Sequence, residues 1–168
     1  MNNPFIHLRS LSSYSLSEST LKITNLVDLA KKNDMPAIAI TDNNNMFGVF
    51  EFSKECVKNN IQPIIGTSIN LLDIIVNNQI SQVTFLVKNE IGYRNLLELS
   101  SLSHLNEGNN IGIHFSQLEK FSEGLFCYIG GEFNPLLLLN QENKKKDIIQ
   151  LIGNFKKIYK QNFLFEIQ

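Results

Sequence analysis

The chain has 168 residues, 43% hydrophobic and 18% charged, so it is long enough and apolar enough to bury a core. Its formal net charge of -1 argues against a domain that grips a nucleic-acid duplex, because such domains contact phosphates through an excess of Lys and Arg. No segment is long and apolar enough to cross a bilayer, and the first residues are too polar for a signal peptide, so we expect a cytoplasmic protein with no membrane partner.

The first half of the chain alternates extended and helical patterns. Residues 5–9 are expected to be extended, and apolar residues at helical spacing then predict a helix over 23–30 that stops at a proline. The unbroken apolar run 37–41 predicts a strand covered on both faces. A second helical stripe spans 46–57, and the run 63–69 predicts the next strand.

The second half continues the same alternation. Strands are predicted at 83–88 and 124–129, with a helical pattern between them over 93–100. The clearest helical stripe follows at 148–159, and 162–167 is expected to be a last strand. Repeated strand–helix units with short connections predict an α/β fold with a largely parallel sheet. Periodicity alone leaves open whether that sheet is open and doubly wound or closed into a barrel.

Several conspicuous residues have simple structural interpretations. Cys56 and Cys127 each lie in an apolar periodic segment, which favours buried free thiols over a disulfide or a metal pair. The lysines at 144–146 are interpreted as a solvated helix start, and His104 and His114, which flank a polar loop, are assigned no role. Five phenylalanines have core-like spacing: Phe47, Phe50, Phe52, Phe126 and Phe155. Packing is therefore favoured over base stacking for them.

Candidate chemistry gathers where the first strands end. Asp42 directly follows the strand expected at 37–41, where α/β folds place functional side chains. A carboxylate there suits a metal or substrate ligand, and it equally suits a turn or helix cap. His7, Arg9 and Leu11 alternate along the first extended segment, so their side chains share one face. A lone histidine on a strand is more typical of a structural hydrogen bond than of a metal ligand.

Five motifs then occur in order along the chain. They are FIHLRSLSSYS at 5–15, MPAIAITD at 35–42 followed by NNMFG at 44–48, QPIIG at 62–66, IGYRNL at 91–96 and GLFCYIGG at 124–131. Together they resemble the PHP (polymerase and histidinol phosphatase) domain at the N-terminus of bacterial DNA polymerase III alpha subunits, the C-family replicative polymerases. The resemblance implies that residues 1–168 are the N-terminal portion of a longer polymerase chain. It also implies a PHP-like distorted (β/α)7 barrel, incomplete at its C-terminal end.

The resemblance implies a metal site from which this chain departs. The complete site of the family is a cluster of divalent metals held by histidines and carboxylates at the strand ends, which suits phosphoester hydrolysis. Arg9 and Leu11 stand where the intact motif has His-x-His, and His7 is not itself a motif ligand. Asn43 replaces the histidine that follows the Thr-Asp pair, and Ser68 replaces the glutamate expected after Ile-Gly-x.

Only Asp42 and Glu18 still offer a carboxylate at these vestigial positions. Two scattered carboxylates without imidazoles do not hold a metal cluster, so we expect no catalytic residues and no metal. A guanidinium standing where a metal would sit can neutralise the carboxylates that remain, so we predict a structural ion pair of Arg9 with Asp42 or Glu18. The alternative is that Arg9 points into solvent or binds a backbone carbonyl.

The leading hypothesis is a non-catalytic structural and docking domain that acts in bacterial DNA replication. In the family, a separate region of the chain carries the DNA-directed DNA polymerase (nucleotidyltransferase) activity. The resemblance implies three partners: the remainder of the alpha subunit, the proofreading exonuclease subunit in some relatives, and DNA only through the full polymerase. One alternative is an active PHP phosphoesterase or 3'-5' proofreading exonuclease, which would bind Zn or Mn. Another is a free-standing remnant that serves only as a binding module.

Overall fold

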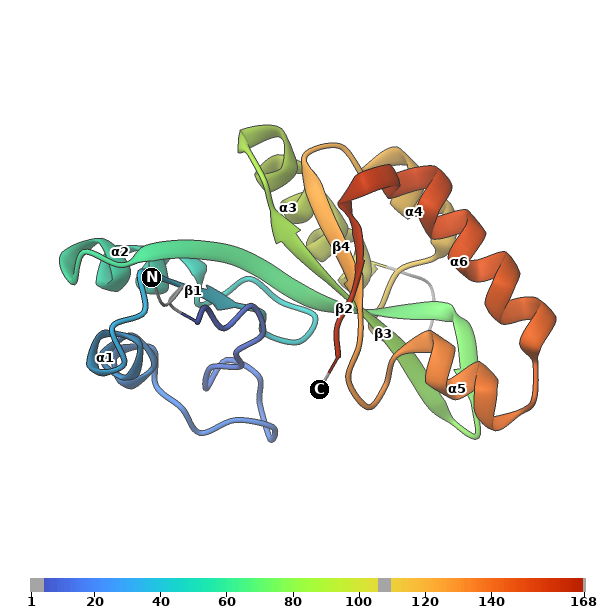
Figure 1. Cartoon of the computed structure of the whole chain (residues 1–168), viewed down its shortest axis with the longest axis horizontal. Coiled ribbons are helices and arrows are strands. Elements are labelled where there is room, and N and C mark those ends of the chain that lie inside the picture. The colour runs from blue at the N-terminus through green and yellow to red at the C-terminus, as the bar shows by residue number, and fades with distance from the viewer. Residues whose placement is uncertain (1–4, 106–109, 168) are drawn as a thin grey trace. The chain divides into compact units, whose positions relative to one another are not determined.

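The computed structural model describes residues 5–105 and 110–167 (Figure 1). It confirms the predicted α/β class, because helices and strands are interspersed along the described chain. The hydrogen-bonded neighbours follow the strand order β1-β2-β3-β4-β5. The chain divides into two compact units, Met1–Thr67 and Ser68–Gln168, and the long strand β2 contributes residues to both. No helix in the described part of the chain has the length and apolar character needed to cross a membrane.

The first unit contains two helices and a parallel strand pair. Its elements are α1 (Ile23–Lys32), β1 (Ala37–Ile40), α2 (Val49–Lys58) and the start of β2 (Gln62–Val76). Strand β1 pairs in parallel with β2, from Ala37 opposite Gln62 to Ile40 opposite Ile65. All four residues of β1 are buried, which confirms a strand covered on both faces.

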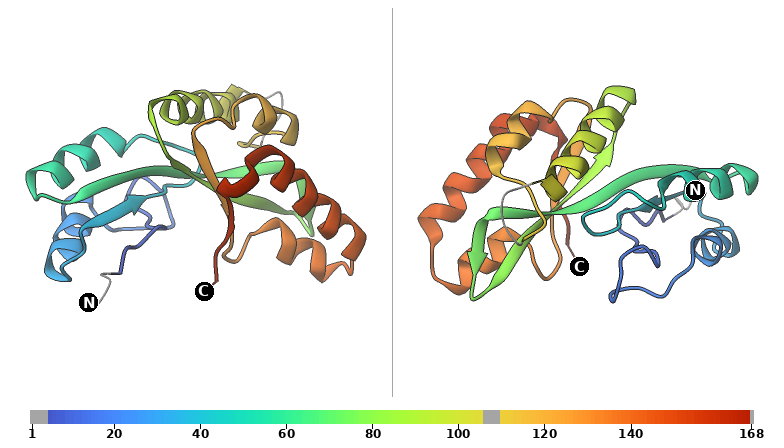
Figure 2. Two further views of the ribbon diagram at one scale, coloured as in Figure 1. Left: turned by 45° about the horizontal axis from the view of Figure 1, so that its top comes forward. Right: turned by 180° about the vertical axis from the view of Figure 1, so that it is seen from behind.

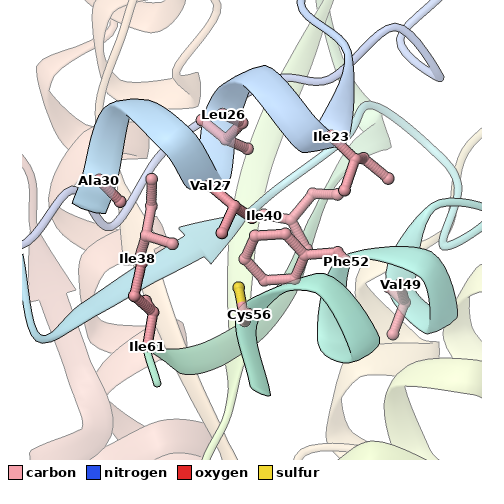
Figure 3. Close-up of a cluster of buried hydrophobic side chains, with 10 residues drawn as sticks. All are labelled: Ile23, Leu26, Val27, Ala30, Ile38, Ile40, Val49, Phe52, Cys56 and Ile61. Atoms are coloured by element: carbon pink, nitrogen blue, oxygen red, sulfur yellow. The ribbon is translucent and has the colours of Figure 1, made fainter. Parts of the chain in front are cut away.

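A compact apolar core fills the first unit (Figure 3). Its buried members are Ile23, Leu26, Val27, Ala30, Ile38, Ile40, Val49, Phe52, Cys56 and Ile61. The residues from α1 are those of the predicted helical stripe. Phe52 and Cys56 are fully buried, and in Figure 3 both point from α2 toward the core. Burial raises the pKa of the Cys56 thiol to about 12, so the side chain behaves as a small apolar group.

The second unit contains the rest of β2 and the remaining elements. They are β3 (Gln79–Val87), α3 (Glu90–Leu105), α4 (Phe115–Lys120), β4 (Leu125–Ile129), α5 (Pro135–Gln141), α6 (Lys145–Tyr159), the short 3-10 turn η1 (Lys160–Asn162) and β5 (Phe163–Phe165). Helices α3 and α6 both contact β4 (Figure 2). Cys127 in β4 is fully buried and, like Cys56, carries a free thiol, as predicted.

The expectation of a largely parallel sheet was wrong in the second unit. Strand β3 pairs antiparallel with β4, although β4 and β5 are parallel. Strands β2 and β3 are joined by only two residues, Asn77 and Asn78, whose φ values are 51° and 64°. Positive φ at both central positions is the signature of a type I′ hairpin turn, which connects antiparallel neighbours. Asparagine tolerates this backbone conformation better than most residues. No turn was predicted at Asn77 and Asn78.

Other local expectations also need correction. Residues 5–9 do not form a strand, although the segment accepts a backbone hydrogen bond from Ala39 to the His7 carbonyl (2.9 Å). Phe47 and Phe50 are not core residues: they are 70% and 76% exposed. Helices α4 and α5 were not predicted. Residues 106–109 of the polar loop after His104 lie outside the described residues.

Candidate functional site

The candidate site lies in the first unit, at the carboxyl end of β1. The strand ends at Ile40, and Thr41 and Asp42 follow as buried polar residues. Asp42 is only 2% exposed. A buried carboxylate needs hydrogen-bond donors or a cation, because leaving it unsatisfied costs several kcal/mol of folding free energy, on the order of the desolvation penalty of a charge.

Two serines and one backbone amide satisfy the Asp42 carboxylate. Its Oδ1 atom accepts hydrogen bonds from the Ser12 backbone N–H (2.6 Å) and the Ser15 hydroxyl (2.7 Å). Its Oδ2 atom accepts one from the Ser12 hydroxyl (2.6 Å). These short distances are typical of donors that meet an ionised carboxylate, which can only accept. We call Ser12, Ser15 and Asp42 the serine–aspartate lock.

The same two hydroxyl groups also accept hydrogen bonds, so each hydroxyl is both a donor and an acceptor. The Ser12 hydroxyl accepts from the Tyr14 backbone N–H (3.2 Å), and the Ser15 hydroxyl accepts from the Asn43 backbone N–H (3.1 Å). At the backbone of Asp42, the carbonyl accepts from the Thr67 hydroxyl (2.7 Å). The lock therefore joins the segment at residues 12–15 to the end of β1, and the Thr67 bond adds strand β2 within the first unit.

Asn45 closes the turn that follows the lock. Its side-chain amide donates to the carbonyls of Tyr14 (3.1 Å) and Asn43 (2.9 Å), and its Oδ1 accepts from the Phe47 backbone N–H (3.2 Å). Asn45 is 6% exposed, so these bonds supply most of what its buried amide requires. The turn 42–47 is thus held by side chains rather than by a regular backbone ladder.

The Tyr14 side chain lies next to this turn and packs against the start of α2. Its hydroxyl donates to a Glu51 carboxylate oxygen at 3.1 Å, and this hydrogen bond is the main cause of the raised pKa of Tyr14. A Cβ atom added at Gly48 would lie 2.7 Å from the Tyr14 ring and 3.0 Å from Ile23. Glycine at this position is therefore what lets the ring lie against the start of α2.

The sequence-predicted site residues are only partly brought together. Asp42 is part of the lock, and Asn43 lies beside it: the Asn43 backbone N–H donates to the Ser15 hydroxyl, and its side-chain amide donates to the Glu18 carboxylate. Leu11 is partly buried, and its carbonyl accepts a hydrogen bond from Ser19 (3.0 Å).

Two predicted site residues are placed differently. Arg9 is partly buried, with a buried Nε atom, and its pairing with a carboxylate stays a prediction. Ser68 belongs to the second unit, where its hydroxyl and that of Thr84 are hydrogen-bonded at 2.8 Å.

The donor set at Asp42 does not match that of a metal cluster. Transition-metal clusters are held by neutral imidazoles and ionised carboxylates that converge within bonding distance. The groups that contact Asp42 are hydroxyls and an amide, and they already occupy both carboxylate oxygens. Across residues 5–105 and 110–167, no three His, Cys, Asp or Glu side chains come together in a metal-binding arrangement.

Ser12 and Ser15 were missed from the sequence as site residues. Both lie in the first motif, FIHLRSLSSYS, in which serine is the commonest residue. A usable signal was present: if Asp42 is buried and the motif histidines are absent, other donors must satisfy the carboxylate. The nearest candidates in the resembling segment are its hydroxyl side chains.

Comparison with known proteins identifies the family. The sequence matches the family described as "PHP domain" over residues 7–168. This chain belongs to the PHP domain family. The PHP domain is 40% identical over 172 aligned positions to the DNA polymerase III subunit alpha of Rickettsia prowazekii, a match that covers 99% of this chain. It is 39% identical to the corresponding subunit of Borreliella burgdorferi and 33% identical to that of Buchnera aphidicola.

The chain spans only a small part of these relatives, 14% of the Rickettsia subunit and 15% of the other two. Two solved structures are also similar to the PHP domain. One is an amidohydrolase from Chromobacterium violaceum with bound sulfate and no metal (TM-score 0.44), and the other is described as a metal-dependent phosphoesterase from Bifidobacterium adolescentis (TM-score 0.43). Each is 16% identical, and each match covers 60% of this chain and 32% of the other.

Proposed function

We propose that this PHP domain is a non-catalytic structural and docking domain of a bacterial DNA polymerase III alpha subunit, acting in DNA replication in the cytoplasm. Relatives at 33–40% identity that bear this name support the parent protein. The observation that carries the non-catalytic role is the lock, in which both oxygens of Asp42 are engaged by Ser12 and Ser15. Nucleotide transfer then belongs to the remainder of the subunit.

The alternative function is phosphoester hydrolysis, either as a PHP phosphoesterase or as a 3'-5' proofreading exonuclease. It requires metal ions that activate a water molecule and polarise the phosphoryl group. A Zn or Mn ion at Asp42 would compete with the two hydroxyl donors and the backbone N–H that bond the carboxylate. The positions of Arg9, Leu11 and Asn43 offer no imidazole in exchange. The donor chemistry therefore favours the non-catalytic function, and no cofactor is part of it.

In this proposal the domain has three contacts outside itself. It packs against the remainder of the alpha subunit, it contacts the proofreading exonuclease subunit, and it meets DNA only through the full polymerase. The net charge of -1 agrees with the last point, because a domain that binds a duplex by itself carries a basic face.

The catalytic alternative is tested with protein purified without chelator. We would measure bound metals by mass spectrometry and assay hydrolysis of p-nitrophenyl phosphate and a single-stranded oligonucleotide, with and without added Zn or Mn. The proposal expects metal far below one ion per chain and no hydrolysis above background. The matched variant is Asp42→Asn: hydrolysis that this substitution abolishes would belong to the domain and would refute the proposal, whereas a contaminant would be unaffected.

The predicted ion pair of Arg9 is part of the proposal and has its own test. A double-mutant cycle combines Arg9→Gln with Asp42→Asn, and a second cycle combines Arg9→Gln with Glu18→Gln. A structural pair predicts a coupling energy of about 0.5–3 kcal/mol in one of the two cycles. Additive effects in both cycles would show that Arg9 does not neutralise either carboxylate.

A further inference from the structure

We propose that the serine–aspartate lock takes the place of a structural cation in this PHP domain. A cation bound at a strand end would gather ligands from separate chain segments around one positive charge. Here the arrangement is inverted, because the central charge is the Asp42 carboxylate and the surrounding groups are donors. The inference rests on the proposed function, since a metal cluster at Asp42 would need the same carboxylate oxygens.

The first argument is the distance along the chain between Asp42 and the three residues whose groups donate to it. Ser12 and Ser15 lie 30 and 27 residues before Asp42, and Thr67 lies 25 residues after it. Bringing such distant segments together costs loop-closure entropy. Hydrogen bonds between residues close in sequence do not hold distant segments together. Four hydrogen bonds that converge on one residue supply the needed cross-links at a single point.

The second argument is the irregular backbone of the segment that the lock holds. Residues 7–15 form no helix or strand. The Thr41 N–H donates to the Ser10 carbonyl (2.8 Å), and the Ser13 N–H donates to the Leu21 carbonyl (2.8 Å). Between these two bonds, the Ser12 N–H is satisfied by the Asp42 carboxylate itself. Without the lock, this N–H would lose its acceptor and the segment would lose its central anchor.

The third argument is that the lock and a metal ion compete for the same carboxylate. Both serine hydroxyls direct their hydrogen atoms at Asp42, and each hydroxyl oxygen accepts one backbone N–H, from Tyr14 at Ser12 and from Asn43 at Ser15. A cation bound through Oδ1 would compete with the Ser12 N–H and the Ser15 hydroxyl and would lie close to their hydrogen atoms. The lock therefore disfavours a metal ion at Asp42, and added metal is expected not to stabilise the folded domain.

The test compares Ser12→Ala, Ser15→Ala and the double variant with the wild-type 168-residue chain. The matched control is Ser13→Ala, because Ser13 lies between them and its side chain is exposed. Thermal unfolding is followed with chelator, with added Zn and with added Mn, and amide hydrogen exchange is measured over residues 10–15. We expect each lock variant to lower the midpoint by about 3–10 °C and the control to change it by at most ~1 °C. The wild-type midpoint should be the same in chelator and in metal.

Each outcome decides something different. A saturable rise of the wild-type midpoint with Zn or Mn would refute both the lock and the non-catalytic function. Lock variants that match the Ser13→Ala control, with no effect of metal, would refute the lock and leave the proposed function standing. If the double variant does not fold, the wild-type exchange data decide, because the lock requires a slowly exchanging Ser12 amide, and rapid exchange there would overturn it.

Discussion

Replacing Asp42 by asparagine tests how much the charge at the centre of the lock contributes to stability. Asparagine keeps the shape of the side chain but exchanges one acceptor oxygen for an NH2 donor. The oxygen that remains can take the place of Oδ1, which accepts from the Ser12 N–H and the Ser15 hydroxyl. The new NH2 group then faces the Ser12 hydroxyl, which donates to Oδ2 at 2.6 Å in the native chain.

The expected loss is therefore one charge-assisted hydrogen bond and the strengthening that the charge gave the other two. A hydrogen bond to a charged group contributes about 1.5–3 kcal/mol, so Asp42→Asn should lower the free energy of unfolding by about that amount. Asp42→Ala removes all three acceptor contacts and leaves three buried donors, at about 1–3 kcal/mol each, so it should cost about 3–9 kcal/mol. The matched control is Asp28→Asn on an exposed position of α1, which should change stability by less than ~0.5 kcal/mol.

The assay is urea unfolding followed by circular dichroism, with hydrogen exchange of the β1 amides as a probe of the first unit alone. The order of stability should be wild type and Asp28→Asn, then Asp42→Asn, then Asp42→Ala. An Asp42→Asn variant as stable as wild type would refute the reasoning, because it would show that the carboxylate charge does not matter to its donors. A more stable variant would do so more strongly, since it would mean that burying the charge costs more than the lock contributes.

Three further predictions concern the first unit. Gly48→Ala places a Cβ 2.7 Å from the Tyr14 ring, so it should destabilise by about 1–3 kcal/mol and change the near-ultraviolet circular dichroism of tyrosine; an unchanged spectrum would contradict the packing. Phe52→Ala should cost about 3–5 kcal/mol, whereas Phe50→Ala, on the same helix but 76% exposed, should cost less than ~1 kcal/mol in the same urea assay. The buried Cys56 thiol should resist a thiol reagent until the chain unfolds. Because its pKa is raised from 9.0 to about 12, the folded state binds more protons than the unfolded state between these two pH values. The free energy of unfolding should therefore fall as pH rises above about 9, which urea unfolding at several pH values would check.

The local parts of the fold could be predicted from the sequence, because they depend on short-range patterns. The stripe on α1 and the fully buried strand β1 follow from spacing within a few residues. Helix α2 was predicted, but Phe50 was wrongly assigned to its buried face. Its buried residues are Val49, Phe52 and Cys56, but Phe50 fits the helical period nearly as well from Met46. A helix with apolar residues on two faces does not reveal from its own sequence which face turns inward.

The candidate site, too, could be predicted only in part. The position of Asp42 at a strand end was predictable, because the strand itself was visible in the apolar run before it. Its partners were not, since Ser12 and Ser15 reach it across 27 to 30 residues of chain. A hydrogen bond between residues so far apart in the chain produces no periodic pattern in the sequence. The resemblance predicts which metal ligands are absent, but only the three-dimensional arrangement shows which groups contact Asp42.

The lock also bears on how such a domain could change during evolution. A histidine in place of Asn43 would add an imidazole but remove the amide that donates to Glu18. Replacing either lock serine would uncover the Asp42 carboxylate before enough ligands existed to hold an ion. In the proposal, each such substitution removes a hydrogen bond at the lock or beside it before enough ligands are present to hold an ion.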